Sequence, residues 1–280
     1  ILDRLTEFET YTESDAICFS GEIGFGVDDL LREVVEGLKK DRKAKVSFFI
    51  ETPGGYLTPV QRIAETLRHH YATVNFFVPN YAMSAGTVLV MAGDAIYMDY
   101  YSILGPIDPQ VPANDGKLVS AIGYIKEYDR LIEKSNDGNL SSAEIAFLLS
   151  KFDPGTLYQY KQDEAFAIAL LQEWLAKYKF KNWTETETRK IKVDDNYRKE
   201  TAAKIGQKLT NPDLWHSHGR GISMKTLEDE VGLKIEDFAK DAELDKRTRA
   251  YFRLLSDYWD RRGHRSLAIH SRNGYNTWRT

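Results

Sequence analysis

The chain has 280 residues, of which 42% are hydrophobic and 29% are charged, and its formal net charge is −4. This length accommodates one α/β domain with a helical appendage and a sizeable core. The acidic balance argues against a nucleic-acid binder, because proteins that track phosphates usually carry a basic excess.

The first third of the chain alternates between strand and helix patterns. Residues 1–14 are polar, and we expect them to form an N-terminal arm. Apolar runs predict strands at 15–20, 45–51, 72–78 and 94–99, and one-sided apolar faces predict helices at 28–40, 59–70 and 84–92. This alternation is typical of right-handed βαβ units and a parallel sheet.

The character of the sequence changes after Gly105. Pro106, Pro109 and Pro112 exclude a regular helix there. Helices are predicted beyond them at 117–134, 141–151, 156–178, 185–209, 226–232 and 242–262. We therefore divide the chain into the arm (1–14), an α/β domain (15–235) that carries a helical insertion (135–210), and a C-terminal helical extension (236–280).

Two predicted turns hold residue types that suit chemistry. Each follows a strand and opens a helix: Glu-Thr-Pro-Gly-Gly ends at Gly55, and Met-Ser-Ala-Gly-Thr contains Ser84. In a parallel sheet both turns lie at the carboxyl ends of neighbouring strands, where open α/β sheets bind ligands. The simple alternatives are an ordinary Pro-Gly-Gly turn and a serine that caps its helix. A phosphate-binding loop fits the sequence less well, because no Gly-Lys-Ser/Thr follows the glycines.

If Ser84 is a nucleophile, the same turns supply an oxyanion hole. Glycines at positions 54 and 55 allow positive φ and bring N–H groups close to a ligand. One of these N–H groups, together with that of Ala85 at the start of the next helix, would stabilise developing negative charge.

These two motifs, followed by Ser-Ile-Leu-Gly-Pro-Ile-Asp-Pro-Gln at 102–110, resemble the serine dehydrogenase proteinase family. That family is related to the signal peptide peptidases and Clp proteases, which share the crotonase-like fold. The resemblance covers about residues 15–130 and returns at 221–233. It implies a Clp/crotonase-like parallel sheet with ββα-type repeats, Ser84 as the nucleophile, and Gly54 or Gly55 with Ala85 as the oxyanion hole.

The resemblance leaves the general base open. Clp proteases place a histidine after the serine, but 105–109 contains none. Signal peptide peptidases use a lysine at the start of a later helix, and Lys117 is the best positional match, with Lys126 second. A lysine base requires a pKa lowered from about 10.4 towards neutrality, whereas the residues around Lys117 look like an exposed turn.

A histidine is the rival base. His216 and His218 immediately precede the segment where the resemblance returns, and Asp108 could orient either one, since triads recur in unrelated orders. The alternative is a His and Arg network that docks the helical region on the core. His-X-His also suggests a metal site, but no further ligand stands at a suitable spacing.

The sequence thus predicts a serine endopeptidase that cleaves polypeptide through an acyl-enzyme, with no cofactor and no metal. We expect a homo-oligomer with the C-terminal helices as its interface, by analogy with the fold family. The alternatives are an inactive Clp-like scaffold and a crotonase-type acyl-CoA enzyme. One cysteine, Cys18, and no apolar run long enough for a bilayer suggest a cytoplasmic protein. An accessory protein, or a membrane anchor upstream of Ile1, stays open.

Overall fold

The computed structural model describes residues 1–107, 110–112, 118–186, 188–263 and 267–277. A seven-stranded sheet forms its centre, in the order β10-β5-β3-β2-β1-β11-β12. The first five strands in this order run parallel, whereas β11 is antiparallel to both β1 and β12. The strands are β1 (Asp15–Gly21), β2 (Lys45–Glu51), β3 (Thr73–Phe77), β5 (Ala95–Met98), β10 (Glu236–Asp237), β11 (Leu267–Ser271) and β12 (Gly274–Thr277).

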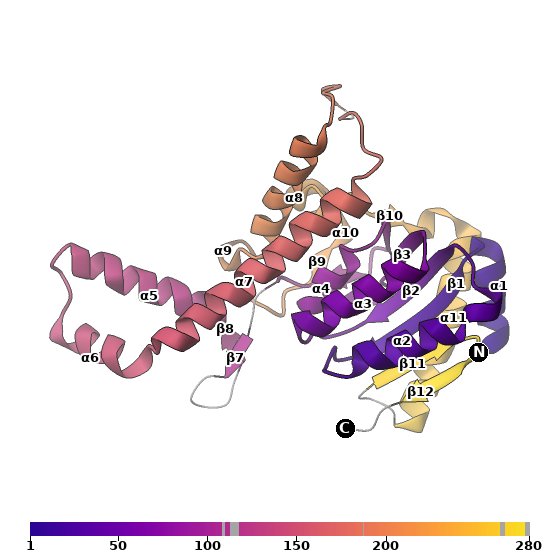
Figure 1. The fold of residues 1–280 in the computed structure, drawn as a ribbon, viewed down its shortest axis with the longest axis horizontal. Coiled ribbons are helices and arrows are strands. Elements are labelled where there is room, and N and C mark those ends of the chain that lie inside the picture. The colour runs from indigo at the N-terminus through magenta and orange to yellow at the C-terminus, as the bar shows by residue number, and fades with distance from the viewer. Residues whose placement is uncertain (108–109, 113–117, 187, 264–266, 278–280) are drawn as a thin grey trace.

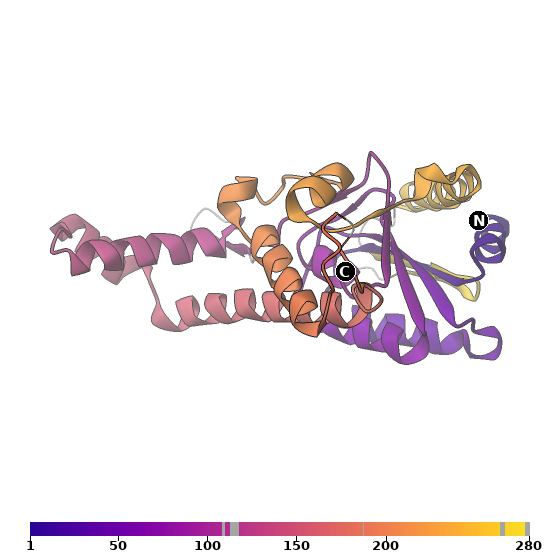
Figure 2. The same ribbon diagram turned by 90° about the horizontal axis from the view of Figure 1, so that it is seen from above.

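Helices cover both faces of this sheet, which gives the three layers visible in Figure 2. Side chains alternate along β2, so that Phe48 packs with one set of helices and Phe49 with the other. The Phe48 face is covered by α2 (Val27–Gly37), α3 (Leu57–His70) and α4 (Ala85–Val90), and the Phe49 face by α1 (Leu2–Thr12) and α11 (Ala242–Arg262). We call the main sheet with these five helices the body.

A second, smaller sheet runs along the carboxyl end of the main one. It contains β4 (Tyr81–Ala82), β6 (Ile103–Leu104) and β9 (Ile222–Ser223), and parallel bridges continue it from Ala82 to Thr52 and from Gly55 to Ile23. Each repeat therefore gives one strand to the main sheet, a short piece to the second sheet, and then a helix. The predicted parallel α/β fold with ββα-type repeats is confirmed.

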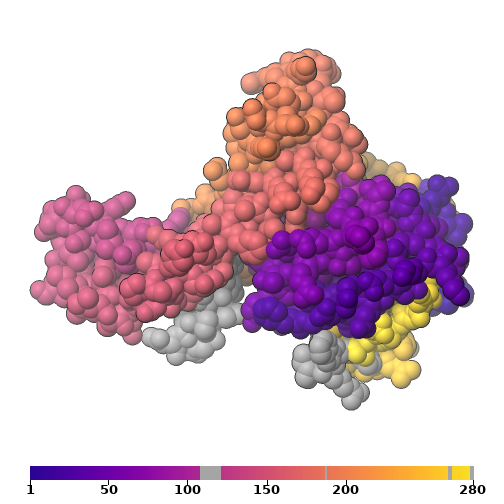
Figure 3. Space-filling model, viewed as in Figure 1, coloured from indigo at the N-terminus to yellow at the C-terminus, as the bar shows by residue number. Residues whose placement is uncertain are grey.

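A helical projection stands out from the body in Figures 1 and 3. We use this name for α5 (Ala121–Asn136), α6 (Ser142–Lys151) and the N-terminal half of α7 (Pro154–Trp174). The C-terminal half of α7 buries Ala167, Leu170, Leu171 and Trp174 in the main core. The remaining elements are the hairpin β7 (Gln110–Pro112) and β8 (Leu118–Ser120), α8 (Asp195–Leu209), α9 (Pro212–Trp215), α10 (Met224–Thr226), and short helical turns at Lys39–Asp41, Leu175–Lys179, Leu227–Val231 and Phe238–Lys240.

Three predicted segments differ in the structure. The segment expected to be a polar N-terminal arm is helix α1, and its Leu5 and Phe8 are fully buried against α11 and the sheet. The helix expected at 117–134 begins only at residue 121, because 118–120 pair as β8. The helix expected at 185–209 begins at Asp195, where Asp194 caps it.

The C-terminal segment contains the predicted long helix and also strands that the sequence did not reveal. Strand β11 extends the main sheet beside β1, with Cys18 opposite His270. Strand β10 adds to the other edge beside β5. The boundary expected at residue 235 therefore lies just before a strand of the main sheet, because strand pairing joins distant parts of the chain.

Candidate active site

Ser84 stands at the N-cap position of α4 in a strained backbone conformation, with φ 50° and ψ −117°. Such a conformation in a residue other than glycine costs about 1–3 kcal/mol and persists only where the surroundings hold it. The half-buried Ser84 hydroxyl makes no cap hydrogen bond to the first turn of α4. The simple alternative of a helix-capping serine is therefore wrong for Ser84.

Gly54 lies directly against Ser84. The parallel bridge from Thr52 to Ala82 brings Gly54, two residues on, beside Ser84. A Cβ atom on Gly54 would lie 2.9 Å from Ser84 Cβ and 3.3 Å from Ala85 N, and Gly54 has φ 114°. Both the space and the backbone conformation require glycine, so the two predicted turns meet at one place.

The N–H groups around Ser84 differ in their availability. Gly54 N–H donates to Thr52 Oγ1 at 3.1 Å. Gly55 is exposed, and within the described part of the chain neither Gly55 N–H nor Ala85 N–H donates a hydrogen bond. Gly55 is held in place by Ile23, because Ile23 N–H donates to Gly54 O at 2.8 Å and Tyr56 N–H donates to Ile23 O at 2.9 Å.

Two threonines fix this arrangement, and the sequence analysis missed both. Thr87 Oγ1 lies 2.8 Å from the carbonyl oxygens of Ala82 and Gly105, and it accepts Gly105 N–H at 3.0 Å. Thr52 Oγ1 accepts the Gly54 N–H described above. Both threonines stand inside the motifs, but the Thr87 partner at Gly105 is 18 residues away and depends on the pairing of β4 with β6, so the motif alone gave only a weak signal.

Glu51, the first residue of its motif, is hydrogen-bonded to Asn80 and Ser20. Its Oε2 accepts Asn80 Nδ2 at 2.7 Å and its Oε1 accepts Ser20 Oγ at 3.3 Å. Burial raises the pKa of the Glu51 carboxyl, although these two hydrogen bonds oppose the rise. Asn80 O in turn accepts Ile103 N–H at 2.9 Å. Glu51 therefore supports the loop that leads to Ser84 from behind.

The candidate bases have different positions. Asp108 and Lys117 lie outside the described residues. Lys126 on α5 is half exposed and pairs with Asp213. His216 is exposed and ends α9 with φ 61°.

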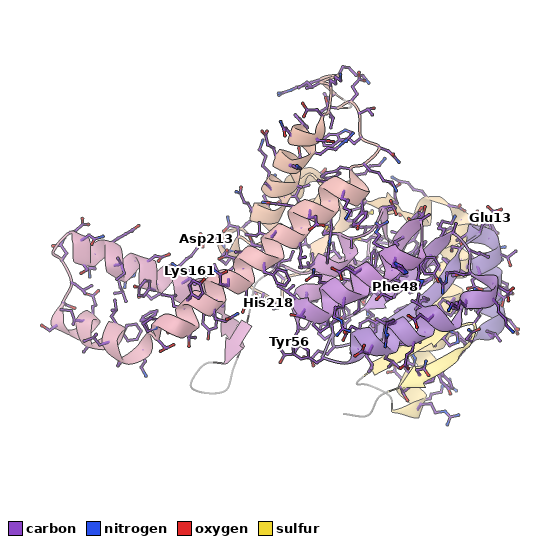
Figure 4. All side chains as sticks on the ribbon, in the orientation of Figure 1. Glu13, Phe48, Tyr56, Lys161, Asp213 and His218 are labelled. Atoms are coloured by element: carbon purple, nitrogen blue, oxygen red, sulfur yellow. The ribbon has the colours of Figure 1, made fainter. Side chains whose placement is uncertain are left out.

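His218 is half-buried in a turn, where Arg220 N–H donates to Ser217 O at 3.1 Å. That turn leads into β9, which pairs with β6, and β6 pairs with β4 just before Ser84. Figure 4 shows His218 and Tyr56 along the edge of the body that faces the helical projection.

The residues that the structure describes contain no group of three or more His, Cys, Asp or Glu side chains placed to hold a metal ion. None of the helices among them has the length and apolar character that crossing a membrane requires.

Residues 27–148 match the family model of the ClpP-like SDH-type serine proteinases. This segment contains both motifs, with Gly55 and Ser84, and the stretch after Ser102. The resemblance predicted from the sequence is therefore confirmed over this segment.

Two uncharacterized proteins of Methanocaldococcus jannaschii are similar to the chain. The first is 29% identical over 191 residues, which are 68% of this chain and 53% of that protein. The second is 36% identical over 116 residues, which are 41% of this chain and 39% of that protein. The chain thus spans about half the length of the first relative and about two fifths of the second.

Solved structures also resemble the chain, at low scores. A membrane-bound stomatin-specific protease aligns with a TM-score of 0.34 and 17% identity, over 56% of this chain and 83% of that one. The ClpP protease catalytic domain from Plasmodium falciparum aligns with a TM-score of 0.30 and 13% identity, over 35% of this chain and 57% of that one.

Proposed function

We propose that this chain, with the sequence of an SDH-type serine proteinase over residues 27–148, is an endopeptidase that cleaves polypeptide through an acyl-enzyme on Ser84. The observation that supports the proposal is the backbone conformation of Ser84 and the contacts around it. Its backbone is strained, its hydroxyl does not cap α4, and Gly54 packs directly against it. Strained backbone that the fold enforces is concentrated at active sites, and a nucleophile on a sharp strand-to-helix turn is such a case.

The oxyanion hole can be assigned from the backbone N–H groups that have no acceptor among the described residues. Ala85 N–H directly follows Ser84, and Gly55 N–H directly follows Gly54, which packs on Ser84. Neither donates to a described acceptor, whereas Gly54 N–H already donates to Thr52. We assign the hole to Gly55 and Ala85. Two such donors stabilise the charge of a tetrahedral intermediate, and the removal of one typically lowers the rate by about two to three orders of magnitude.

The reaction then proceeds in two halves. Ser84 Oγ forms a bond to the scissile carbonyl carbon while a base accepts its proton, and the oxyanion is held by the two N–H groups. The C–N bond breaks as the base returns the proton to the leaving amine. Water, deprotonated by the same base, attacks the acyl-enzyme ester and releases the carboxyl product and Ser84.

For the base we keep two candidates, Lys117 and His218. The resemblance to signal peptide peptidases favours Lys117. The position of His218 in the turn before β9 supports His218, because two short strand pairings, of β9 with β6 and of β6 with β4, link that turn to the residues just before Ser84. Lys126 is disfavoured, since it is paired with Asp213, and so is His216, which is exposed. If His218 is the base, Asp108 is the residue we expect to orient it.

A fluorophosphonate probe tests the nucleophile directly. We expect labelling at Ser84 in the wild type, and loss of both labelling and peptide cleavage in Ser84→Ala with unchanged folding. Ser141→Ala is a matched control, because Ser141 accepts a true cap hydrogen bond from Glu144 N–H. That variant should weaken α6 and leave labelling intact. An unlabelled wild type would instead favour the inactive scaffold or the acyl-CoA enzyme.

Four substitutions identify the base. We expect Lys117→Ala or His218→Ala to abolish cleavage, whereas Lys126→Ala and His216→Ala should retain it. The pH profile of the wild type gives an independent reading: a lysine base requires activity that rises around or above about pH 7–8, and a histidine base a rise near pH 6.5. Full activity in both Lys117→Ala and His218→Ala would exclude both candidates.

A further inference from the structure

An exposed pair of aromatic rings is carried by the segments next to the proposed oxyanion hole. Phe25 is 68% exposed and Tyr56 is 55% exposed, and neither belongs to a core cluster. Their ring centroids are 4.8 Å apart, with a tilt of 34° between the planes. The rings cover each other in part and leave a shared apolar surface open to solvent.

The backbone ties this pair to Ser84. Tyr56 directly follows Gly55, and its N–H donates to Ile23 O at 2.9 Å, so the segments that carry the two rings are joined. Phe25 stands between Gly24 and Gly26, on a loop that presents the ring without packing around it. Tyr56 comes two residues after Gly54, so their Cα atoms are at most about 7 Å apart.

Scattered exposed apolar residues are ordinary on protein surfaces. A joined apolar pair next to a nucleophile and two free N–H donors is the arrangement of a ligand site, in which apolar walls surround a few convergent polar groups. The Phe25 ring has no polar group, and the Tyr56 hydroxyl makes no hydrogen bond to any residue that the structure describes. The surface therefore suits a flat apolar group better than a charged one.

We propose that Phe25 and Tyr56 form a substrate subsite that selects a large apolar side chain, an aromatic one above all. This inference rests on the proposed function and adds a specificity determinant to it. An extended peptide rises about 3.3 Å per residue. The selected side chain therefore belongs to a residue within about two positions of the scissile bond.

Direct binding tests the subsite without catalysis. Peptides that differ only at one position near the cleaved bond, with Phe, Leu, Ala or Asp there, are titrated onto the Ser84→Ala protein by fluorescence anisotropy. We expect the Phe peptide to bind most tightly. Adding Phe25→Ala or Tyr56→Ala should weaken it about tenfold, the scale of one aromatic contact, and should change the Ala peptide less than about twofold. Tyr56→Phe should retain the preference.

Leu2→Ala is the control, because Leu2 is 51% exposed on α1, at the end of the body away from the projection. In catalytically competent protein the same ring substitutions should raise KM for the Phe peptide, leave kcat nearly unchanged, and leave Ser84 labelling intact.

Equal binding of all four peptides by Ser84→Ala protein would overturn the subsite. A smaller oligomer in the ring variants, with unchanged peptide preference, would show that the pair is an interface between copies. Loss of the proposed function alone would appear as an unlabelled wild type that still prefers the Phe peptide.

Discussion

The body and the helical projection contain similar helices that are used differently. In the body, α3 buries Pro59, Val60, Ile63, Ala64 and Leu67. In the projection, α6 buries no residue, although it contains Ile145, Phe147 and Leu149. An apolar sequence therefore does not ensure burial, because burial also needs a surface to pack against.

The two helices are stabilised by different means. Packing on the sheet holds α3, whereas α6 depends on local contacts: Ser141 and Glu144 form a capping box, and Lys134 Nζ donates to Glu144 Oε1 at 2.6 Å. The bond from Lys134 ties α6 to α5 and not to the body. The body therefore supplies the packed elements that can hold a catalytic site, whereas the projection leaves apolar side chains of α6 exposed.

The sharpest test compares two glycines with positive φ. Gly54→Ala places a Cβ atom 2.9 Å from Ser84 Cβ, whereas Gly138→Ala, in the loop between α5 and α6, meets nothing within 4 Å. We expect Gly54→Ala to lower kcat/KM at least about 100-fold by displacing Ser84. Gly138→Ala should keep full activity and lose about 1 kcal/mol of stability or less. Similar activity in the two variants would contradict the assigned site.

The next test concerns a largely buried ion pair of the body that also contacts the segment after α7. Arg68 and Asp94 are 10% and 12% exposed and lie 2.7 Å apart. Arg68 also stacks on Tyr178 at 3.7 Å. Although burial opposes it, hydrogen bonds from Lys181, Val74 N–H and Arg68 hold the pKa of Asp94 below its usual range.

We expect Arg68→Ala to lower the free energy of unfolding by roughly 3 kcal/mol, since it removes one of the two cations paired with the largely buried Asp94 carboxylate, the other being Lys181. Arg130→Ala is the matched variant in the projection, where the exposed Arg130 pairs with Glu127 at 2.7 Å. That change should leave the denaturation midpoint where it was. Equal shifts in chemical denaturation would show that the two regions do not differ in this respect.

Acid should affect the two regions in separate pH ranges. In the body, burial lowers the pKa of His270 to about 4, and its Nδ1 lies 2.8 Å from Tyr251 Oη. Between about pH 6.5 and 4 the unfolded chain takes up a proton that the folded chain excludes, so up to roughly 3 kcal/mol of stability is lost as pH falls. His270→Gln should flatten this part of the profile.

In the projection, the hydrogen bond from Lys134, with those from Ser141, lowers the pKa of Glu144 to about 2. The contribution of that carboxylate is present above its usual range and is lost as pH falls from about 4.5 towards 2. As pH falls, the α6 amides should therefore lose their protection against hydrogen exchange at a lower pH than the pH at which the thermal denaturation midpoint of the body drops. Loss of α6 protection already at pH 5 would contradict this order.

The smallest effect on stability is expected at Leu149, which is 78% exposed on α6. Leu149→Ser should change the stability of a single copy by less than about 0.5 kcal/mol. Leu89→Ser in the body, at a fully buried position, should cost several kcal/mol. If the chain forms the homo-oligomer we expect, but through α6 in place of the C-terminal helices, Leu149→Ser should lower the mass measured by sedimentation. An unchanged mass would place the interface elsewhere.

Much of the fold follows from short stretches of sequence. The apolar run at 45–51 and the one-sided pattern of Ile63, Ala64 and Leu67 are local signals, and β2 and α3 lie where these signals predict. The sequence did not predict helix α1, because most of its residues are polar and its contribution to the core consists mainly of Leu5 and Phe8. Strand β11 was missed because its partner, β1, lies far away in the chain.

The sequence by itself determined the residue types at the candidate site: a serine at a strand-to-helix turn and glycines where backbone must approach it closely. The tertiary structure decided what each one does. Pairing of Thr52 with Ala82 brought the two turns together, so that Gly54 packs on Ser84 while Gly55 N–H and Ala85 N–H have no described acceptor. The physical reason is that residue type and φ preference are local properties, whereas the approach of one turn to another is fixed only when distant segments pack.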